Sequence, residues 1–309
     1  MEYRRLGKNG PKVPVIGLGT WTLGGGMGRV DEKTAVDTIH AAIENGITLT
    51  DTAEAYLESE NIIGKAIGGG YRNRCFLATK VSGDFSRKGI RSAVERSLSA
   101  LKTDWVDLYQ LHRWKPEYPI EESMETLREL QKEGKTRFIG VSNFNAQQMS
   151  QALKALDIAY FDSNQLCYNM YDREIEAEEI PFCREHGIGI LSHSTLAKGL
   201  LAGKYTESTA FGADDERSEF YRFKEENLKG YVKTAEKLQA VAADKSLNLI
   251  QLSLAWALRK AEVSCSLVGA KKPEHILTYL GALDASISKE ELKLIDDILT
   301  EAPKVKREK

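Results

Sequence analysis

Short apolar runs alternate with segments of helical periodicity along the whole chain. We expect eight of these runs to be strands, at residues 16–19, 49–52, 75–80, 105–112, 136–142, 161–165, 189–192 and 266–268. Such alternation is typical of repeated βα units around a parallel sheet. Eight repeats predict an α/β fold of the (β/α)8 TIM barrel type.

The intervals between these runs have the spacing of amphipathic helices. In residues 34–45, for example, Ala35, Ile39 and Ile43 fall on one face. Gly46 follows at the position after the helix, where glycine accepts a positive φ. This pattern predicts a helix that ends at a defined residue before the second strand.

Two segments lie outside the eightfold pattern. Residues 3–15 contain two short apolar runs around a turn with glycine and proline, which predicts an N-terminal β-hairpin. Residues 206–227 form a long loop after the seventh strand, and loops of this length commonly cover an active site. Because no linker or break in composition divides the chain, we expect one domain over residues 1–309.

An open doubly wound sheet is the rival architecture. Residues 17–24 superficially resemble its G-x-G-x-x-G dinucleotide fingerprint, but the third glycine of that fingerprint falls on Thr22. More glycines follow where a helix should begin. The sequence therefore favours the barrel, in which any nicotinamide cofactor is held in another way.

The amino-acid composition limits the classes of partner that we expect the protein to bind. The formal net charge is -2, and the charged residues, 28% of the chain, form neither a basic stripe nor a basic amphipathic helix, so we expect no nucleic-acid or membrane partner. No run of 18 apolar residues occurs, and no apolar leader follows Met1. The four cysteines, Cys75, Cys167, Cys183 and Cys265, form no CxxC pair, which indicates no metal site and a reducing cytoplasm. No feature decides the oligomeric state.

Four polar residues at or just beyond predicted strand ends are candidates for catalysis. Asp51, Lys80 and His112 end the second, third and fourth strands, and Tyr56 follows Asp51 closely. Each alone is more often a structural residue, but the carboxyl ends of barrel strands meet at one mouth. Together, a phenol, an ammonium, a carboxylate and an imidazole predict a proton-transfer site.

Their roles follow from ordinary acid–base chemistry. A free phenol has a pKa of about 10, so we expect Lys80 to stabilise the anion of Tyr56 and Asp51 to keep Lys80 charged. His112 would hold a carbonyl oxygen while Tyr56 protonates it during hydride attack. In an alternative of a different class, Lys80 would be the nucleophile of a Schiff-base aldolase.

These residues and their surroundings resemble the aldo-keto reductase superfamily, in particular its bacterial and potassium-channel β-subunit-like branch. The similarity covers essentially the whole chain and includes residues 17–21, 51–56, 59–60, 140–144, 164–169 and 199–205. The resemblance implies an oxidoreductase that reversibly transfers a hydride from NADPH to small aldehydes or ketones. A cofactor-sensing subunit with slow turnover is the alternative within the same family.

The resemblance also implies binding roles. The nicotinamide end would be formed by Gly19, Thr20, Trp21, Asp51, Ser142, Asn143, Gln165 and Tyr168, of which Tyr168 stacks on the ring. The pyrophosphate would lie along Leu196, Gly199, Leu200, Gly203 and Lys204, and the adenosine phosphate against Gly269, Lys271, Lys272 and His275. Lys271 and Lys272 favour NADP(H) over NAD(H). From the residue types alone, the two lysines are equally well explained as exposed surface charges. Substrate would contact Trp21, Tyr56, His112 and Trp114.

Several positions depart from the pattern that the resemblance implies. Leu57 stands where glycine is common, His193 and Thr195 replace tyrosine and proline, and His275 and Tyr279 replace glutamine and asparagine. Aromatic residues of the 206–227 loop either form walls of the substrate site or pack beneath the loop. The four catalytic candidates are all intact.

Overall fold

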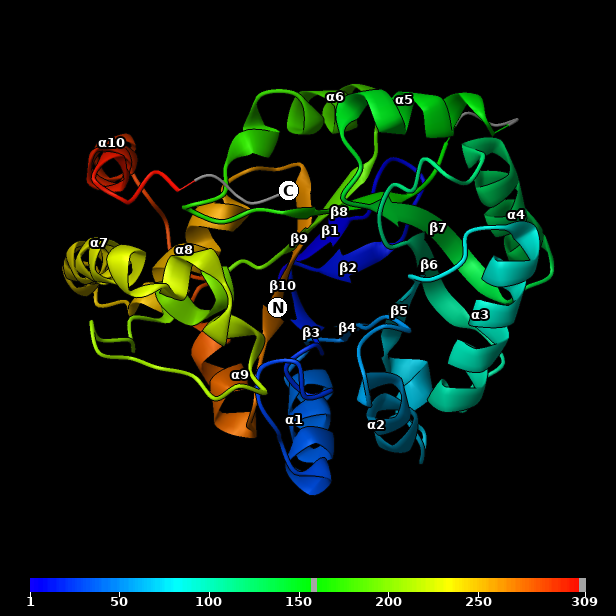
Figure 1. Ribbon diagram of the computed structural model, residues 1–309, viewed down its shortest axis with the longest axis horizontal. Coiled ribbons are helices and arrows are strands. Elements are labelled where there is room, and N and C mark those ends of the chain that lie inside the picture. Colours follow the sequence, from blue (N-terminus) through cyan, green and yellow to red (C-terminus); the bar gives the residue numbers. More distant parts are fainter. Residues whose placement is uncertain (157–159, 306–309) are drawn as a thin grey trace.

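The computed structural model describes residues 1–156 and 160–305, and its centre is a closed barrel of eight parallel strands (Figure 1). Around the barrel the order is β10-β3-β4-β5-β6-β7-β8-β9. The strands are β3 (Ile16–Gly19), β4 (Leu49–Asp51), β5 (Phe76–Val81), β6 (Val106–Leu111), β7 (Thr136–Ser142), β8 (Ser163–Cys167), β9 (Gly189–His193) and β10 (Val263–Gly269). Each predicted run overlaps one of these strands, so the predicted (β/α)8 barrel is confirmed.

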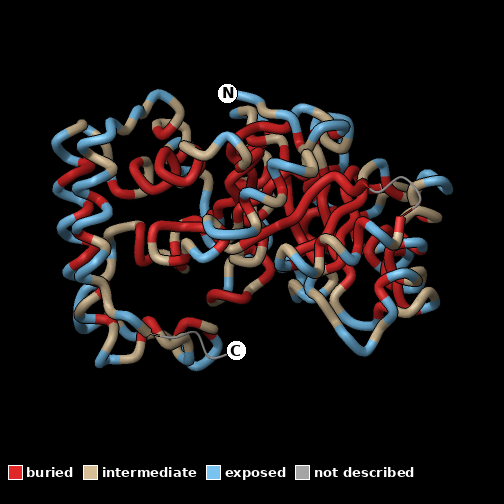
Figure 2. Tube along the Cα trace, turned by 90° about the horizontal axis from the view of Figure 1, so that it is seen from above, coloured by how far each residue is buried: buried red, intermediate tan, exposed pale blue. Residues whose placement is uncertain are grey.

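Helices surround the barrel and leave their polar faces outside. They are α1 (Glu32–Glu44), α2 (Ser59–Ala66), α3 (Arg87–Leu101), α4 (Ile120–Lys132), α5 (Ala146–Lys154), α6 (Glu179–His186), α7 (Glu225–Ala243), α8 (Leu249–Leu258), α9 (Pro273–Leu280) and α10 (Lys289–Thr300). Helix α1 begins where Asp31 accepts a hydrogen bond from the Thr34 amide, and it ends before Gly46, whose φ is +84°. Figure 2 shows buried residues concentrated in the centre and exposed residues along the outer helices.

The predicted hairpin is present and closes the amino-terminal end of the barrel. Strands β1 (Tyr3–Arg5) and β2 (Lys12–Pro14) pair in antiparallel fashion. Leu6 and Val13 join an apolar cluster with residues of the barrel interior such as Leu108 and Leu191. Because this end is filled with apolar side chains, polar chemistry is left to the opposite end.

The long loop between β9 and α7 is fixed to the barrel rather than free. The Arg222 guanidinium donates to both carboxylate oxygens of Asp172, at 2.8 and 2.7 Å. Phe211 and Phe223 pack edge to face with each other and with Tyr205, at 4.8 to 5.6 Å between ring centroids. Of the two alternatives for the aromatic residues of this loop, packing beneath the loop describes Phe211 and Phe223, and both rings pack on Tyr205, the residue immediately before it.

Candidate active site

The four candidate catalytic residues come together at the carboxyl ends of neighbouring strands. Asp51 ends β4, Lys80 lies near the end of β5, His112 follows β6, and Tyr56 lies in the turn before α2. The Lys80 ammonium donates to Asp51 Oδ1 and to the Thr52 carbonyl, each at 2.7 Å. Its Nζ is 4.8 Å from the ring centroid of Tyr56.

Lys80 and Asp51 form a buried ion pair, with side chains that are 0% and 3% exposed. Burial opposes the charge on Lys80, but Asp51 and Tyr56 outweigh it and raise the pKa of the amine. Burial raises the pKa of Asp51, against the opposing effect of Lys80 and of the Gln165 amide, which donates to Oδ2 at 2.8 Å. Lys80 is therefore a fixed cation beneath the phenol.

The phenol of Tyr56 is less acidic in this structure than the sequence predicts. Burial raises its pKa above the ordinary value of 10, and the opposing effect of Lys80 does not cancel that of burial. The ring packs edge to face between Trp21 and His112, with centroid distances of 5.1 and 5.6 Å. Tyr56 thus holds its proton at neutral pH, as a proton donor must.

His112 is a neutral imidazole. Burial, followed by the nearby positive charge of Lys80, lowers its pKa to about 2. Its Nδ1 is 2.5 Å from the Ser82 hydroxyl oxygen. A neutral histidine has one N–H to offer, so His112 is suited to donate a hydrogen bond rather than a proton.

A cavity of about 660 Å³ opens beside these residues, within the size range of cofactor and ligand sites. Tyr56 and His112 line it at one end, and Lys271 and His275 line it at the other. Twelve of the residues expected at the site lie on its wall: Gly19, Trp21, Asp51, Tyr56, His112, Gln165, Leu196, Gly199, Lys204, Gly269, Lys271 and His275.

Comparison with known proteins identifies the family. The sequence profile of the Aldo/keto reductase family matches residues 15–300. The chain is 38% identical to aldo-keto reductase YhdN of Bacillus subtilis, over 97% of this chain and 94% of that protein. The chain belongs to the aldo/keto reductase family.

Two further proteins are similar to this aldo/keto reductase over nearly its whole length. A protein of Escherichia coli named NADH-specific methylglyoxal reductase is 32% identical, over 96% of this chain and 98% of its own length. The solved structure of the glycerol dehydrogenase AKR11B4 of Gluconobacter oxydans superimposes with a TM-score of 0.88 at 30% identity, covering 99% and 98% of the two chains. The names of these two relatives state different substrates, and one of the names states a cofactor, NADH.

Several predicted site residues of this aldo/keto reductase do not reach the cavity. Tyr168 is fully buried, packs on Trp256, and bonds through its hydroxyl to Glu176 and Arg259, so its ring has no face open for a nicotinamide. Trp114 packs against Phe144 instead of forming a substrate wall. Neither side chain lines the cavity in this structure.

Other predicted residues support the site from behind its wall. Thr20 donates its hydroxyl hydrogen to the Asp51 carbonyl at 2.7 Å, and Ser142 donates to the Gln165 carbonyl at 3.0 Å. Asn143 donates to the His112 carbonyl at 3.1 Å. Lys272 is exposed and does not line the cavity. In this structure Thr20, Ser142 and Asn143 bond to residues that line the cavity and do not form its wall themselves.

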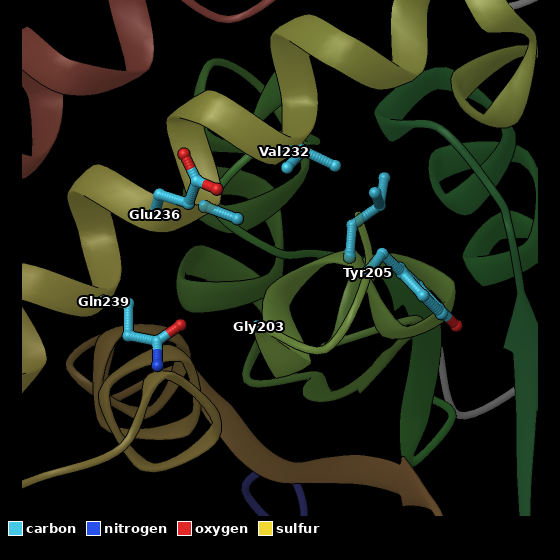
Figure 3. A pocket seen from close by; sticks show the side chains of 7 residues that line it. Gly203, Tyr205, Val232, Glu236 and Gln239 are labelled. Atoms are coloured by element: carbon cyan, nitrogen blue, oxygen red, sulfur yellow. The ribbon is translucent and has the colours of Figure 1, made fainter. Parts of the chain in front are cut away.

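Leu200 and Gly203, which the resemblance assigns to the pyrophosphate, line a separate small recess. Figure 3 shows Val232, Glu236 and Gln239 around that recess with Gly203 and Tyr205. Its volume is about 10 Å³, which is room for about one water molecule. These two residues of the aldo/keto reductase lie beside the main cavity but outside its wall.

Sequence reasoning missed several residues that do line the cavity. Glu216 and Arg217 belong to the long loop, and His193 is the last residue of β9. Glu216 accepts a hydrogen bond from Trp21 Nε1 at 2.8 Å and forms an ion pair with Lys198, whose Nζ is 2.5 Å from Oε1. The replacement of tyrosine by His193 was a signal in the sequence, whereas no local pattern indicated Glu216 or Arg217.

In the described part of the chain, no helix is long and apolar enough to cross a membrane.

Proposed function

We propose that this aldo/keto reductase reversibly transfers a hydride from NADPH to small aldehydes and ketones, with Tyr56 as the proton donor. The observation that carries the proposal is the buried Asp51–Lys80 ion pair beneath the Tyr56 phenol, at the wall of a cavity that His112 also lines. Core packing does not require this combination, whereas carbonyl reduction uses every member of it.

Each residue has a distinct task. His112 donates a hydrogen bond to the carbonyl oxygen and so stabilises the negative charge that develops there. Tyr56 then transfers its proton to that oxygen, and the Lys80 ammonium stabilises the phenolate that remains. When bound, the reduced nicotinamide supplies the hydride. In the reverse direction the same groups remove the hydroxyl proton of an alcohol.

The cationic end of the cavity supports NADPH as the cofactor. Lys204, Arg217 and Lys271 converge on this end from three separate segments. Burial lowers the pKa of Lys204 and of Lys271, and repulsion by Arg217 adds to the effect at both. Asp215 pairs with Arg217 and offsets part of this positive charge. The positive charge that remains suits a phosphate dianion such as the 2′-phosphate of NADPH.

The contacts of Lys80 argue against the Schiff-base alternative. A nucleophilic lysine must be neutral and open to substrate. Lys80 is fully buried, is bonded to Asp51 and Thr52, and has a raised pKa. Cys75, Cys183 and Cys265 are free thiols, which supports the proposal that the enzyme works in the reducing cytoplasm.

Replacing Tyr56 tests the proposed reaction directly. With NADPH and a reactive aldehyde, the wild-type enzyme is expected to oxidise NADPH, which is followed as a fall in the nicotinamide absorbance. Tyr56→Phe is expected to lose this activity but still to bind NADPH, which is followed as quenching of the protein fluorescence. Tyr3→Phe, which removes an exposed phenol in β1, serves as the matched control and should behave like wild type. Undiminished turnover in Tyr56→Phe would contradict the assignment.

Separate titrations with NADPH and NADH test the cofactor. We expect Lys271→Ala to weaken NADPH binding roughly tenfold or more, because a charge-assisted hydrogen bond to phosphate is lost, and to change NADH binding little. Lys272→Ala is the matched comparison, since this neighbouring lysine is exposed and does not line the cavity. Equal affinities for the two cofactors in the wild-type enzyme would refute the preference.

A further inference from the structure

We propose that Ser82 is a positioning residue that holds His112 in the tautomer with its proton on Nε2, and that Glu54 in turn fixes Ser82. This inference rests on the proposed function, in which His112 donates to the carbonyl oxygen. Neither Ser82 nor Glu54 lies on the cavity wall, so both act through the imidazole.

The pairing of two strands places Ser82 beside His112. Val81 and Leu111 are partners in the parallel register of β5 and β6, and the next residues along both strands are Ser82 and His112. The His112 amide donates to the Val81 carbonyl at 3.0 Å, which continues the pairing one step further. The Ser82 hydroxyl oxygen then lies 2.5 Å from His112 Nδ1.

The direction of this hydrogen bond decides what His112 can do. In the proposed arrangement the Ser82 hydroxyl donates its hydrogen to Nδ1, which is the only hydrogen-bond partner of that hydroxyl among the described residues. A neutral imidazole that accepts at Nδ1 carries its proton on Nε2, where it can be donated to a substrate oxygen. With the bond reversed, Nε2 would be an acceptor and would repel the carbonyl oxygen.

Glu54 holds the backbone that carries the serine. Its Oε1 accepts the amide hydrogens of Ser82 at 2.5 Å and of Gly83 at 2.8 Å. Its Oε2 accepts from the Arg96 guanidinium at 3.1 Å. The Glu54 side chain is only 15% exposed, so these contacts limit the movement of the loop after β5. The result is a continuous series of contacts from Arg96 through Glu54 and Ser82 to His112.

Three serine variants test the assignment by activity. We expect Ser82→Ala to lower kcat/KM for an aldehyde about fivefold, the equivalent of about 1 kcal/mol for one hydrogen bond. Ser82→Thr keeps the hydroxyl and should restore most of the loss. Ser92→Ala, an exposed serine on α3, is the matched control for loss of a hydroxyl. A loss that Ser82→Thr does not restore, or no loss in Ser82→Ala, would overturn the proposal.

The tautomer itself is measured by NMR without turnover, so this test is independent of the proposed reaction. In protein labelled with ¹⁵N-histidine, His112 is one of five histidines and is assigned by its absence from His112→Gln. The wild-type protein should show a protonated Nε2, and Ser82→Ala should show a mixture of both tautomers. A wild-type spectrum with the proton on Nδ1 would refute the role of Ser82, even if the enzyme reduces aldehydes.

A double-mutant cycle tests Glu54. Glu54→Gln leaves a weaker, neutral acceptor and should lower kcat/KM less than Ser82→Ala does. Because Glu54 is proposed to act through Ser82, adding Glu54→Gln to Ser82→Ala should cause no further loss. Independent, additive losses would show that Glu54 serves the site in another way and would remove it from the proposal.

Discussion

Replacing Lys80 with methionine keeps an apolar stem of similar length and removes the ammonium group from the centre of the site. The lost group lies 2.7 Å from Asp51 Oδ1, in a pair whose two side chains are 0% and 3% exposed. Asp51 keeps its bond to Gln165 but loses its neutralising charge. The variant therefore isolates what the cation contributes to stability and to catalysis.

We expect a loss of about 3–5 kcal/mol in the free energy of unfolding at pH 7, the usual result of leaving one member of a buried ion pair alone. The loss depends on pH through Asp51, whose pKa burial raises even in the presence of Lys80. A carboxyl with a raised folded-state pKa favours the folded state below its unfolded pKa, and this advantage disappears as the pH rises through the folded pKa. The defect should therefore shrink on moving from pH 8 to pH 5.

The effect on catalysis follows from the distance between Lys80 and the phenol. Lys80 Nζ lies 4.8 Å from the centroid of the Tyr56 ring, and at that distance, with an effective dielectric constant of about 20, two unit charges interact by about 3.5 kcal/mol. The loss of this stabilisation in the transition state corresponds to a kcat that is lower by about three hundredfold. NADPH affinity should change much less, because the cationic end of the cavity is untouched.

Urea unfolding and aldehyde reduction, measured on the same preparations, check both expectations. The double variant Lys80→Met with Asp51→Asn is the control, because it removes both charges and should recover most of the stability but not the activity. A double variant no more stable than Lys80→Met, or a single variant that turns over at the wild-type rate, would refute the reasoning.

Two further predictions concern the closed end of the barrel. Burial raises the pKa of Asp162 to about 6, although the hydrogen bond from the Ile139 amide opposes this shift. Protonation of Asp162 therefore stabilises the folded state, and this stabilisation is lost as the pH rises from about 4 through 6. Urea unfolding of Asp162→Asn should show a stability gain relative to wild type that increases by up to about 3 kcal/mol from pH 4.5 to pH 7.5, and a constant difference would contradict the assignment. Gly7→Ala should destabilise the fold by about 2 kcal/mol or more, because its Cβ would lie 2.7 and 2.8 Å from the carbonyl oxygens of Asp162 and Gly187. Gly69→Ala, with a similar φ of +63° and open space around it, should cost only about 1 kcal/mol, and equal thermal shifts would refute the steric argument.

Local sequence patterns were sufficient to predict the barrel and the group of polar residues at its mouth. Strand periodicity needs only local residues, and parallel strands in a barrel all end at the same mouth, so Asp51, Lys80 and His112 were expected to meet before their distances were known. The same local logic predicted the hairpin and the end of α1 at Gly46. These features depend on residues close together in the chain.

The tertiary structure decided which side chains face the cavity. Tyr168 was an expected ring partner of the nicotinamide, but packing on Trp256 and bonds to Glu176 and Arg259 bury it. Arg217, in contrast, joins Lys271 at the cationic end although 54 positions separate them in the chain. Cavity walls and charge clusters are formed by contacts between distant segments, and neither local periodicity nor residue type contains that information.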